Sequence, residues 1–314
     1  MVKVMKSRLK TQLSAPLLCI LGPTASGKTQ LAVALAQELH AEIISADSRQ
    51  VYKGMDIGTG KDLQEYGSVP YHLINIRTPD MPYDVGQYGI DFQKSYQHIQ
   101  SLGKPAILCG GSGLYLQAAL QGFQQVQIPQ NPELRQYLED LSNTALHAHF
   151  LQLKTRNRYK HDIKTRKRLI RAIEIGQWLE AHPECQPTNQ NKSAHIFGIN
   201  PELELRRKRI SLRLEDRLQA GLVAEVEGLL QHGVSSDQLI RYGLEYKFTC
   251  MYLDGAFPFQ VYKTKLETAI HQFAKRQMTF FRKMEKDGLK IYWLKSNSKA
   301  EQIEEILKKQ NEFL

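Results

Sequence analysis

Residues 22 to 29 read GPTASGKT and match the phosphate-loop pattern G-x-x-x-x-G-K-[ST] at every fixed position. The segment lies between the apolar run PLLCIL and a helical pattern that begins near Leu31. A strand that turns into a helix through glycines directs backbone N–H groups and the positive end of the helix dipole at one point. Such a point binds a diphosphate or a triphosphate, and the motif leaves open whether the phosphate belongs to ATP.

The residues expected to bind this phosphate are Gly22, Thr24, Ala25, Ser26, Gly27, Lys28 and Thr29. Lys28 would place a positive charge on the terminal phosphate, and Thr29 would supply a hydroxyl ligand for Mg²⁺, the one cofactor that we expect. Gly22 and Gly27 would allow the backbone to approach the ligand closely.

The distribution of apolar runs predicts an α/β fold. Four runs, PLLCIL, AEIIS, YHLINI and KPAILC, alternate with helical patterns over residues 13–122, the rhythm of a parallel sheet with helices on both faces. Residues 123–192 are rich in helix formers, glutamine and bases, which indicates an inserted helical domain. The run HIFGI then returns the chain to the core over residues 193–314. That part is expected to contain long helices over 202–232 and about 258–286, a strand at KIYWL and a charged tail helix.

Polar residues follow the predicted strands. Asp47 comes after the second strand, and Ser112, in the turn Gly-Gly-Ser-Gly, comes after the fourth. Ligands of parallel sheets bind at the carboxyl ends of the strands, so we expect both side chains beside the phosphate loop. The Asp47 carboxylate could accept a proton from a substrate, hold a magnesium-bound water or cap the next turn. The Ser112 hydroxyl could donate to a ligand, or the turn could simply be tight.

The charge balance favours a polyanionic partner. Lysine and arginine number 42 against 32 acidic residues, which gives a net charge of +10. Near the C-terminus, KRQMTFFR interleaves bases with aromatic side chains, which suits RNA, although the phenylalanines fit a protein core equally well. The predicted insertion holds a run of bases denser than solubility requires: Lys154, Arg156, Arg158, Lys160, Lys164, Arg166, Lys167, Arg168 and Arg171.

A predicted helix after Pro201 carries Arg209, Arg213 and Arg217 at every fourth residue, and therefore along one face. These arginines could bind a phosphate or form a solvated face paired with nearby carboxylates. The four cysteines are far apart and form no C-x-x-C pair, which indicates a reducing compartment and no structural metal. No apolar stretch approaches the roughly 20 residues that a membrane span requires.

Six segments, taken together and in order, resemble the tRNA dimethylallyltransferase family, also called the tRNA isopentenyltransferases. They are GPTASGKT, ISADSRQVYKGMDIGTGK, VPYHLI, GGSGLYL, RLIRAIE and KRQMTFFR, and the match runs from about residue 17 to 295. The resemblance implies a P-loop, nucleotide-kinase-like core with an inserted helical domain. It also implies an enzyme that transfers the dimethylallyl group from dimethylallyl diphosphate to N6 of the adenosine 3′-adjacent to the tRNA anticodon (position 37), with Mg²⁺, and releases diphosphate. The eukaryotic zinc finger is absent, so we expect a bacterial type in the cytoplasm, and a monomer.

The resemblance also assigns roles to residues. Asp47 would be the general base, assisted by Ser112, where the family usually has threonine, and by Arg213, which best matches the arginine of the family's R-x-x-x-R stretch. The phosphate loop would hold the diphosphate of the prenyl donor. Three groups would contact the anticodon stem-loop of the tRNA: Asp47, Ser48, Arg49 and Gln50; Arg166, Lys167, Arg168 and Arg171; and Lys275, Arg276 and Gln277.

The sequence departs from the family pattern at three places. Lys164-Thr165 stands where an N-D dipeptide is common, residues 242–245 read YGLE in place of G-Y-[KR]-[QE], and Phe280 replaces a tryptophan. Two other functions stay open. An isopentenyltransferase for free AMP, ADP or ATP would not need the basic insertion. A P-loop kinase would use Asp47 on a hydroxyl, but the strand PAILC ends in Gly110-Gly111 and not in the magnesium-binding Asp usual in such enzymes.

Overall fold

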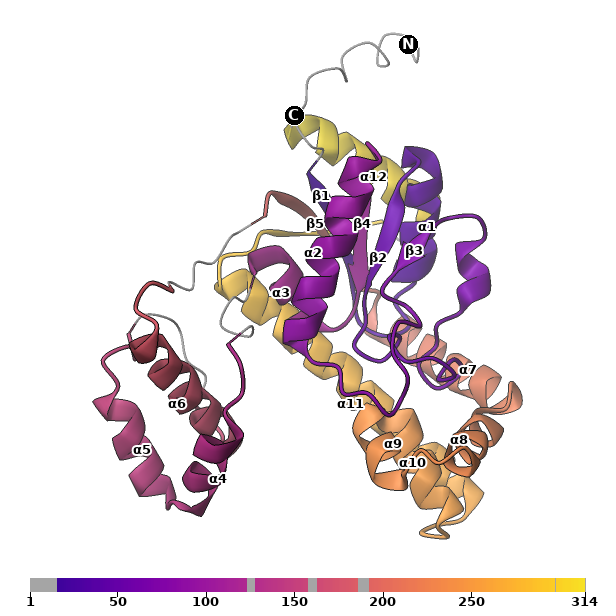
Figure 1. The fold of residues 1–314 in the computed structure, drawn as a ribbon. Helices are drawn as coiled ribbons and strands as arrows, with labels where there is room; N and C mark the ends of the chain where they lie inside the picture. Colours follow the sequence, from indigo (N-terminus) through magenta and orange to yellow (C-terminus); the bar gives the residue numbers. More distant parts are fainter. Residues whose placement is uncertain (1–15, 123–127, 158–162, 186–191, 297, 314) are drawn as a thin grey trace.

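The computed structural model describes residues 16–122, 128–157, 163–185, 192–296 and 298–313, and Figure 1 shows the fold that they adopt. The region boundaries predicted at residues 13 and 123 fall outside these ranges, as do Arg158 and Lys160 of the basic run. Among the described residues, no helix has the length and apolar character of a membrane span.

A parallel sheet of six strands lies at the centre of the described residues, in the order β3-β2-β4-β1-β5-β6. Every residue of β1 is buried, as expected for a strand covered on both faces. The predicted strand YHLINI is shorter than expected, because Leu73 and Asn75 adopt φ angles of +64° and +56° and leave the extended conformation. The strands are β1 (Leu17–Leu21), β2 (Glu42–Ala46), β3 (Tyr71–His72), β4 (Ala106–Gly110), β5 (Ala194–Gly198) and β6 (Ile291–Trp293).

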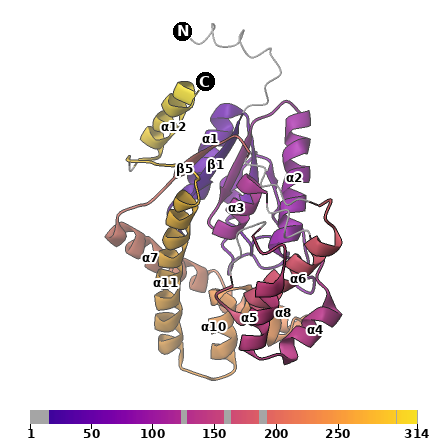
Figure 2. The ribbon, with the colours of Figure 1, turned by 90° about the vertical axis from the view of Figure 1, so that its left-hand side faces the viewer.

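Helices cover both faces of the sheet, which confirms the predicted α/β class (Figures 1 and 2). Alternate residues of β1 serve different faces: Leu18 and Ile20 pack in the cluster of α1 and α12, whereas Leu17 and Leu21 pack with the helices opposite. The helices on the two faces are α1 (Lys28–Leu39) and α12 (Lys299–Phe313), then α2 (Val85–Ser101), α3 (Gly113–Gln121) and α11 (Phe259–Lys286). A short 3₁₀ helix, η2 (Leu63–Tyr66), precedes β3.

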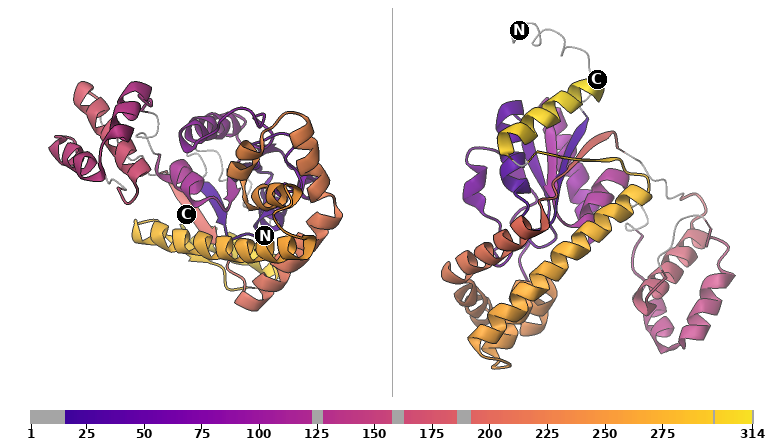
Figure 3. Two further views of the ribbon diagram at one scale, coloured as in Figure 1. Left: turned by 90° about the horizontal axis from the view of Figure 1, so that it is seen from below. Right: turned by 180° about the vertical axis from the view of Figure 1, so that it is seen from behind.

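Three helices of the predicted insertion stand to one side of the sheet (Figure 3). They enclose a small core of their own, in which Leu138, Leu146 and Ile173 are fully buried. Each helix begins at a capping side chain that accepts a backbone N–H: Asn131, Ser142 and Thr165. The helices are α4 (Pro132–Asp140), α5 (Asn143–Gln152) and α6 (Arg166–Ala181).

Four further helices lie beyond the carboxyl ends of the strands, where α11 joins them (Figures 1 and 2). The prediction of one helix over residues 202–232 is wrong. The chain breaks at Gly221, which adopts φ +100°, a conformation that glycine tolerates and that ends a helix. The helices are α7 (Leu203–Gln219), α8 (Leu222–Gln231), α9 (Ser236–Tyr242) and α10 (Leu244–Leu253).

Candidate active site

The phosphate loop joins the end of β1 to the start of α1, as the sequence predicts. Ala25 and Gly27 adopt positive φ angles of +59° and +85°, which turn the chain back on itself. The N–H of Leu31 makes the first bond of α1, to the Gly27 carbonyl at 3.1 Å, so the N–H groups before it have no helical acceptor. The Ser26 hydroxyl is buried and has no hydrogen-bond partner among the described residues. Unpaired donors gathered at a helix N-terminus form an anion site.

Lys28 and Thr29 open α1 and line the space in front of this loop. The Lys28 Nζ donates to the Pro23 carbonyl at 3.3 Å. Burial lowers the pKa of Lys28, and the nearby Cys109 and Asp47 oppose this effect only in part. A cation that has already lost part of its hydration interacts strongly with an anion placed beside it.

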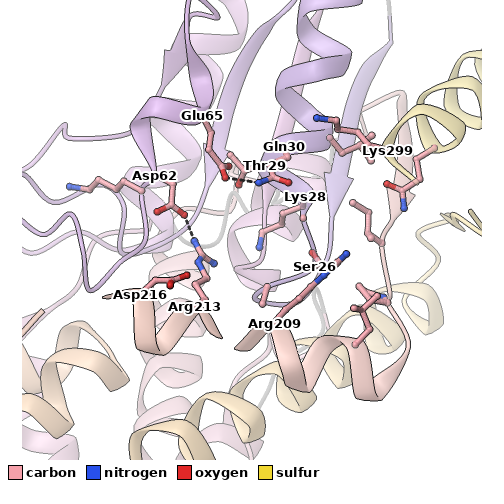
Figure 4. Close-up of a pocket in the computed structure, with 18 of the residues that line it drawn as sticks. Ser26, Lys28, Thr29, Gln30, Asp62, Glu65, Arg209, Arg213, Asp216 and Lys299 are labelled. Carbon is pink, nitrogen blue, oxygen red and sulfur yellow. Dashed lines mark hydrogen bonds and ion pairs between the residues drawn. The ribbon is translucent and has the colours of Figure 1, made fainter. Parts of the chain in front are cut away.

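A groove of about 1020 Å³ opens beside the loop, between α1, α7, residues 294–296 and the start of α12. Figure 4 shows Lys28 extending into it from α1 and Arg213 extending from α7, with Arg209 nearby on the same helix. Carboxylates line it as well, among them Asp62 and Asp216. The predicted arginine face of α7 is therefore the wall of a groove that faces the phosphate loop.

The three arginines of α7 have different surroundings. Arg213 forms an ion pair with Asp62 and donates to the Gly60 carbonyl at 3.2 Å. Arg217 donates to Glu245 at 3.1 Å, and its Nε has no hydrogen-bond partner among the described residues. Burial lowers the pKa of Arg217, and Arg213 lowers it further. Arg209 lines only this groove, whereas Arg213 and Arg217 also line the cavity described next.

A second, smaller cavity of about 50 Å³ contains Asp47. The Asp47 Oδ1 accepts the backbone N–H of Arg49 at 3.0 Å, so this carboxylate does cap the turn that follows β2. Ile270 and Phe273 of α11 form its apolar wall. The groove and the cavity adjoin, since Lys28, Thr29, Arg213 and Arg217 line both.

Ser112 contacts the turn that carries Asp47 and lines neither the groove nor the cavity. Its Oγ accepts the backbone N–H of Ser48 at 3.0 Å and lies 3.3 Å from the Ser48 hydroxyl. The hydroxyl thus holds the residue after Asp47, which is a positioning contact.

The residues expected to contact tRNA differ in exposure. Lys167 and Arg168 on α6 and Lys275 and Arg276 on α11 are exposed, whereas Gln277 is only 7% exposed. Their assignment to tRNA stays a prediction.

Several side chains of that set make contacts within the protein. The Arg166 guanidinium donates to the Glu139 and Leu141 carbonyls at 2.7 and 2.6 Å, which closes the end of α4. Arg171 lies 3.5 Å from Glu174. Arg49 lies 3.7 Å from Glu245, with its guanidinium 4.6 Å from the centre of the Phe273 ring. Gln50 donates to the Gly60 carbonyl at 3.0 Å.

The donor set limits how Mg²⁺ could be held. Among the described residues, no group of three or more His, Cys, Asp or Glu could hold a metal ion by itself. Thr29 and Asp47 nevertheless place a hydroxyl and a carboxylate on one cavity. Mg²⁺ commonly takes one or two protein oxygens and completes its shell with phosphate and water. These residues fit an ion that arrives with a diphosphate.

The fold and site define a P-loop α/β protein with a carboxylate and arginines around the phosphate loop. The family model described as IPP transferase matches residues 50–284, and that described as isopentenyl transferase matches residues 15–67. The chain belongs to this IPP transferase family.

Two relatives and a solved structure support this membership. The chain is 46% identical to "tRNA dimethylallyltransferase 2" of Bacteroides fragilis, over 95% of this chain and 98% of that one. It is 47% identical to "tRNA dimethylallyltransferase 1" of Parabacteroides distasonis, over 92% and 95% of the two chains. Among solved structures, the tRNA isopentenylpyrophosphate transferase of Bacillus halodurans matches with a TM-score of 0.70 and 29% identity, over 95% of this chain and 97% of that one. A eukaryotic dimethylallyltransferase acting on tRNA shares the fold, with a TM-score of 0.73 at 21% identity, over 88% of this chain and 73% of that one.

Two features of the site were missed by the sequence reasoning. Glu225 of α8 accepts the N–H groups of Asp56, Ile57 and Gly58 at 2.7, 2.7 and 2.9 Å, and so holds the loop that contacts Arg213. Lys61 is 1% exposed, and its Nζ donates to the Tyr52 carbonyl, Asp56 and Asn75. The sequence offered no signal for the second, because lysine is ordinarily exposed and its three oxygen partners come together only in the fold.

Proposed function

We propose that this protein transfers the dimethylallyl group from dimethylallyl diphosphate to N6 of the adenosine 3′-adjacent to the anticodon of tRNA. One observation carries the proposal: the groove beside the phosphate loop adjoins the cavity that contains Asp47, with Lys28, Thr29, Arg213 and Arg217 as common walls. A diphosphate bound in the groove would therefore present its prenyl carbon to a base in the cavity. The relatives named tRNA dimethylallyltransferase support this chemistry.

The reaction requires a base because the N6 amine is a poor nucleophile, with its lone pair delocalised into the purine ring. As the nitrogen forms a bond to C1 of the dimethylallyl group, the bond from C1 to the diphosphate oxygen breaks, and its electron pair leaves with the diphosphate. The nitrogen then carries one proton too many, and Asp47 would accept it. The products are N6-dimethylallyladenosine and diphosphate.

The leaving diphosphate gains negative charge as the bond breaks, and fixed positive groups favour that change. The donors that face this space are the N–H groups at the start of α1 that have no helical acceptor, the Lys28 ammonium and the guanidinium groups of Arg213 and Arg217. Mg²⁺ would be held by Thr29 together with the diphosphate, and it would supply further neutralisation of charge.

The exposed lysine and arginine side chains suit an RNA partner, because they can bind its phosphates. Lys167 and Arg168 lie on the insertion, and Lys275 and Arg276 lie on α11. We infer that these two surfaces hold the anticodon stem and loop, while the adenine leaves its stack to reach Asp47 at a cost of a few kcal/mol. Residues 123–192 would then be an RNA-binding insertion between two core parts, 13–122 and 193–314. A cytoplasmic location and a monomeric state stay predictions.

The acceptor distinguishes this proposal from its alternatives. Dimethylallyl diphosphate labelled in the prenyl group would be supplied with Mg²⁺ and one of three acceptors: an anticodon stem-loop with adenosine 3′ of the anticodon, AMP, or ATP. We expect label in the stem-loop alone. Label in AMP would indicate an enzyme of free nucleotides, and ATP hydrolysis without transfer would indicate a P-loop kinase or NTPase.

A further inference from the structure

Gln277 is a buried polar residue in the segment KRQMTFFR of α11, and both polar atoms of its side-chain amide form hydrogen bonds. Its Oε1 accepts the backbone N–H of Thr24 at 2.8 Å, and its Nε2 donates to the Gly111 carbonyl at 2.9 Å. The preceding residues, Lys275 and Arg276, are exposed. One amide thus joins two backbone segments that are far apart in the sequence.

The two segments carry the two halves of the proposed site. Thr24 belongs to the phosphate loop, and Gly111 directly precedes Ser112, whose Oγ accepts the Ser48 N–H at 3.0 Å. Ser48 follows Asp47 in the turn after β2. A continuous series of contacts therefore runs from the phosphate loop through Gln277 to the base.

The fit at Gly111 is close. A Cβ at this position would lie 2.5 Å from the Gln277 Nε2 and 3.2 Å from the Gly22 carbonyl oxygen, so a larger residue would force the amide or the phosphate loop to move. The backbone at residue 111 is therefore within reach of the amide only because it has no side chain.

We propose that Gln277 is a positioning residue, which sets the separation between the phosphate loop and the turn that carries Asp47. This role takes the place of the RNA contact expected from the sequence, and it rests on the proposed function. It would matter for transfer because the reacting atoms must be held at about 3–3.5 Å, and a displacement of 1 Å can cost a hundredfold in rate. Loss of two buried hydrogen bonds at this point would allow such a displacement.

The test compares Gln277→Met with Gln272→Met, which makes the same change at an exposed position of the same helix. Binding of dimethylallyl diphosphate without RNA, and of the anticodon stem-loop without diphosphate, would each be measured by calorimetry, and kcat by transfer. For Gln277→Met we expect the Kd for the diphosphate to rise about tenfold and kcat to fall at least tenfold. The Kd for RNA should stay within twofold, and Gln272→Met should change none of the three.

Gln277→Asn is the second variant, and it guards against a methionine variant that does not fold. Asparagine keeps an amide for RNA but is too short to reach both Thr24 and Gly111, so it should show the diphosphate and kcat defects. If either folded variant binds the diphosphate like the wild type and binds RNA more weakly, Gln277 is an RNA contact and the inference is wrong. If the wild type itself does not bind dimethylallyl diphosphate, the proposed function fails, and the inference fails with it.

Discussion

Arg213 and Asp62 form an ion pair across the groove, between α7 and the loop before η2 (Figure 4). Both side chains are partly exposed, at 33% and 45%, so the pair itself contributes little to stability. A diphosphate in the groove would compete with the Asp62 carboxylate for the Arg213 guanidinium. The pair therefore has more importance for ligand affinity than for folding.

Neutralising Asp62 should strengthen diphosphate binding. For Asp62→Asn we expect the Kd for dimethylallyl diphosphate to fall about two- to fivefold, in line with the strength of an exposed ion pair. Asp216→Asn is the matched control, since it removes the same charge from another carboxylate of the groove. Equal effects of the two changes would mean that general charge, and not competition for Arg213, sets the affinity.

Deprotonation of Lys28 should reduce the activity at alkaline pH. Burial lowers its pKa, and the charged form is the one that binds diphosphate, so affinity is lost as the pH rises through this lowered pKa. The pH profile of kcat/KM, which reports on the free enzyme, should fall on the alkaline side below pH 10.5, the ordinary value for lysine. Lys28→Arg should retain part of the activity and shift this fall beyond the measured range. An unchanged profile in the arginine variant would assign the alkaline limit to another group.

The Glu42 carboxylate should stabilise the folded protein at pH values above about 4.5. Burial would raise the pKa of Glu42, but hydrogen bonds from Lys104 and His72 outweigh that effect and hold the pKa below its usual value of 4.5. A carboxyl group with a lowered pKa in the folded state stabilises the protein above its unfolded pKa, and this contribution is lost as the pH falls through the folded value. The free energy of unfolding should therefore decrease below about pH 4.5, with a smaller slope in Glu42→Gln. Glu42 begins β2 and Asp47 follows its end, so transfer at neutral pH should be unaffected in the folded variant.

Lys167 and Arg166 are neighbours on α6 that should respond differently to a reversal of charge. Lys167→Glu should weaken binding of the stem-loop and reduce its dependence on salt by about one counterion, with unchanged thermal stability. Arg166→Glu should lower the melting temperature, because its guanidinium donates to the Glu139 and Leu141 carbonyls. Filter binding over a range of salt concentrations and thermal unfolding would measure the two effects. If Lys167→Glu leaves the salt dependence unchanged, the exposed face of α6 does not bind RNA.

The sequence predicts the sheet well because strands buried on both faces are continuous apolar runs, as in PLLCIL and PAILC. It predicts the limits of α11 as well, since Pro258 precedes this helix and Gly288 follows its end. The tail helix α12 was predicted without limits. The break at Gly221 was not foreseen, because the apolar pattern continues through it from α7 into α8. A periodic pattern shows which residues share a helix face and does not show where the backbone takes a positive φ.

Some residues of the site could be predicted from their position along the sequence, and others could not. The phosphate loop and Asp47 could be predicted because each directly follows a strand, and the carboxyl ends of parallel strands share one edge. The hydrogen-bond partners of long side chains could not be predicted in this way. Sequence gives Arg166 and Gln277 the same character as their exposed neighbours, but their guanidinium and amide groups bind backbone carbonyls and an N–H that tertiary packing brings to them.

The most direct test of this account is the rate of transfer by Asp47→Asn in a single turnover, with enzyme and both substrates saturating. Asparagine keeps an oxygen that can accept the Arg49 N–H, so the turn should persist, but it cannot accept the proton of N6. We predict a rate lower by a factor of about 10² to 10⁴, with the Kd for dimethylallyl diphosphate changed less than about threefold. A rate within tenfold of the wild type would show that Asp47 is not the base.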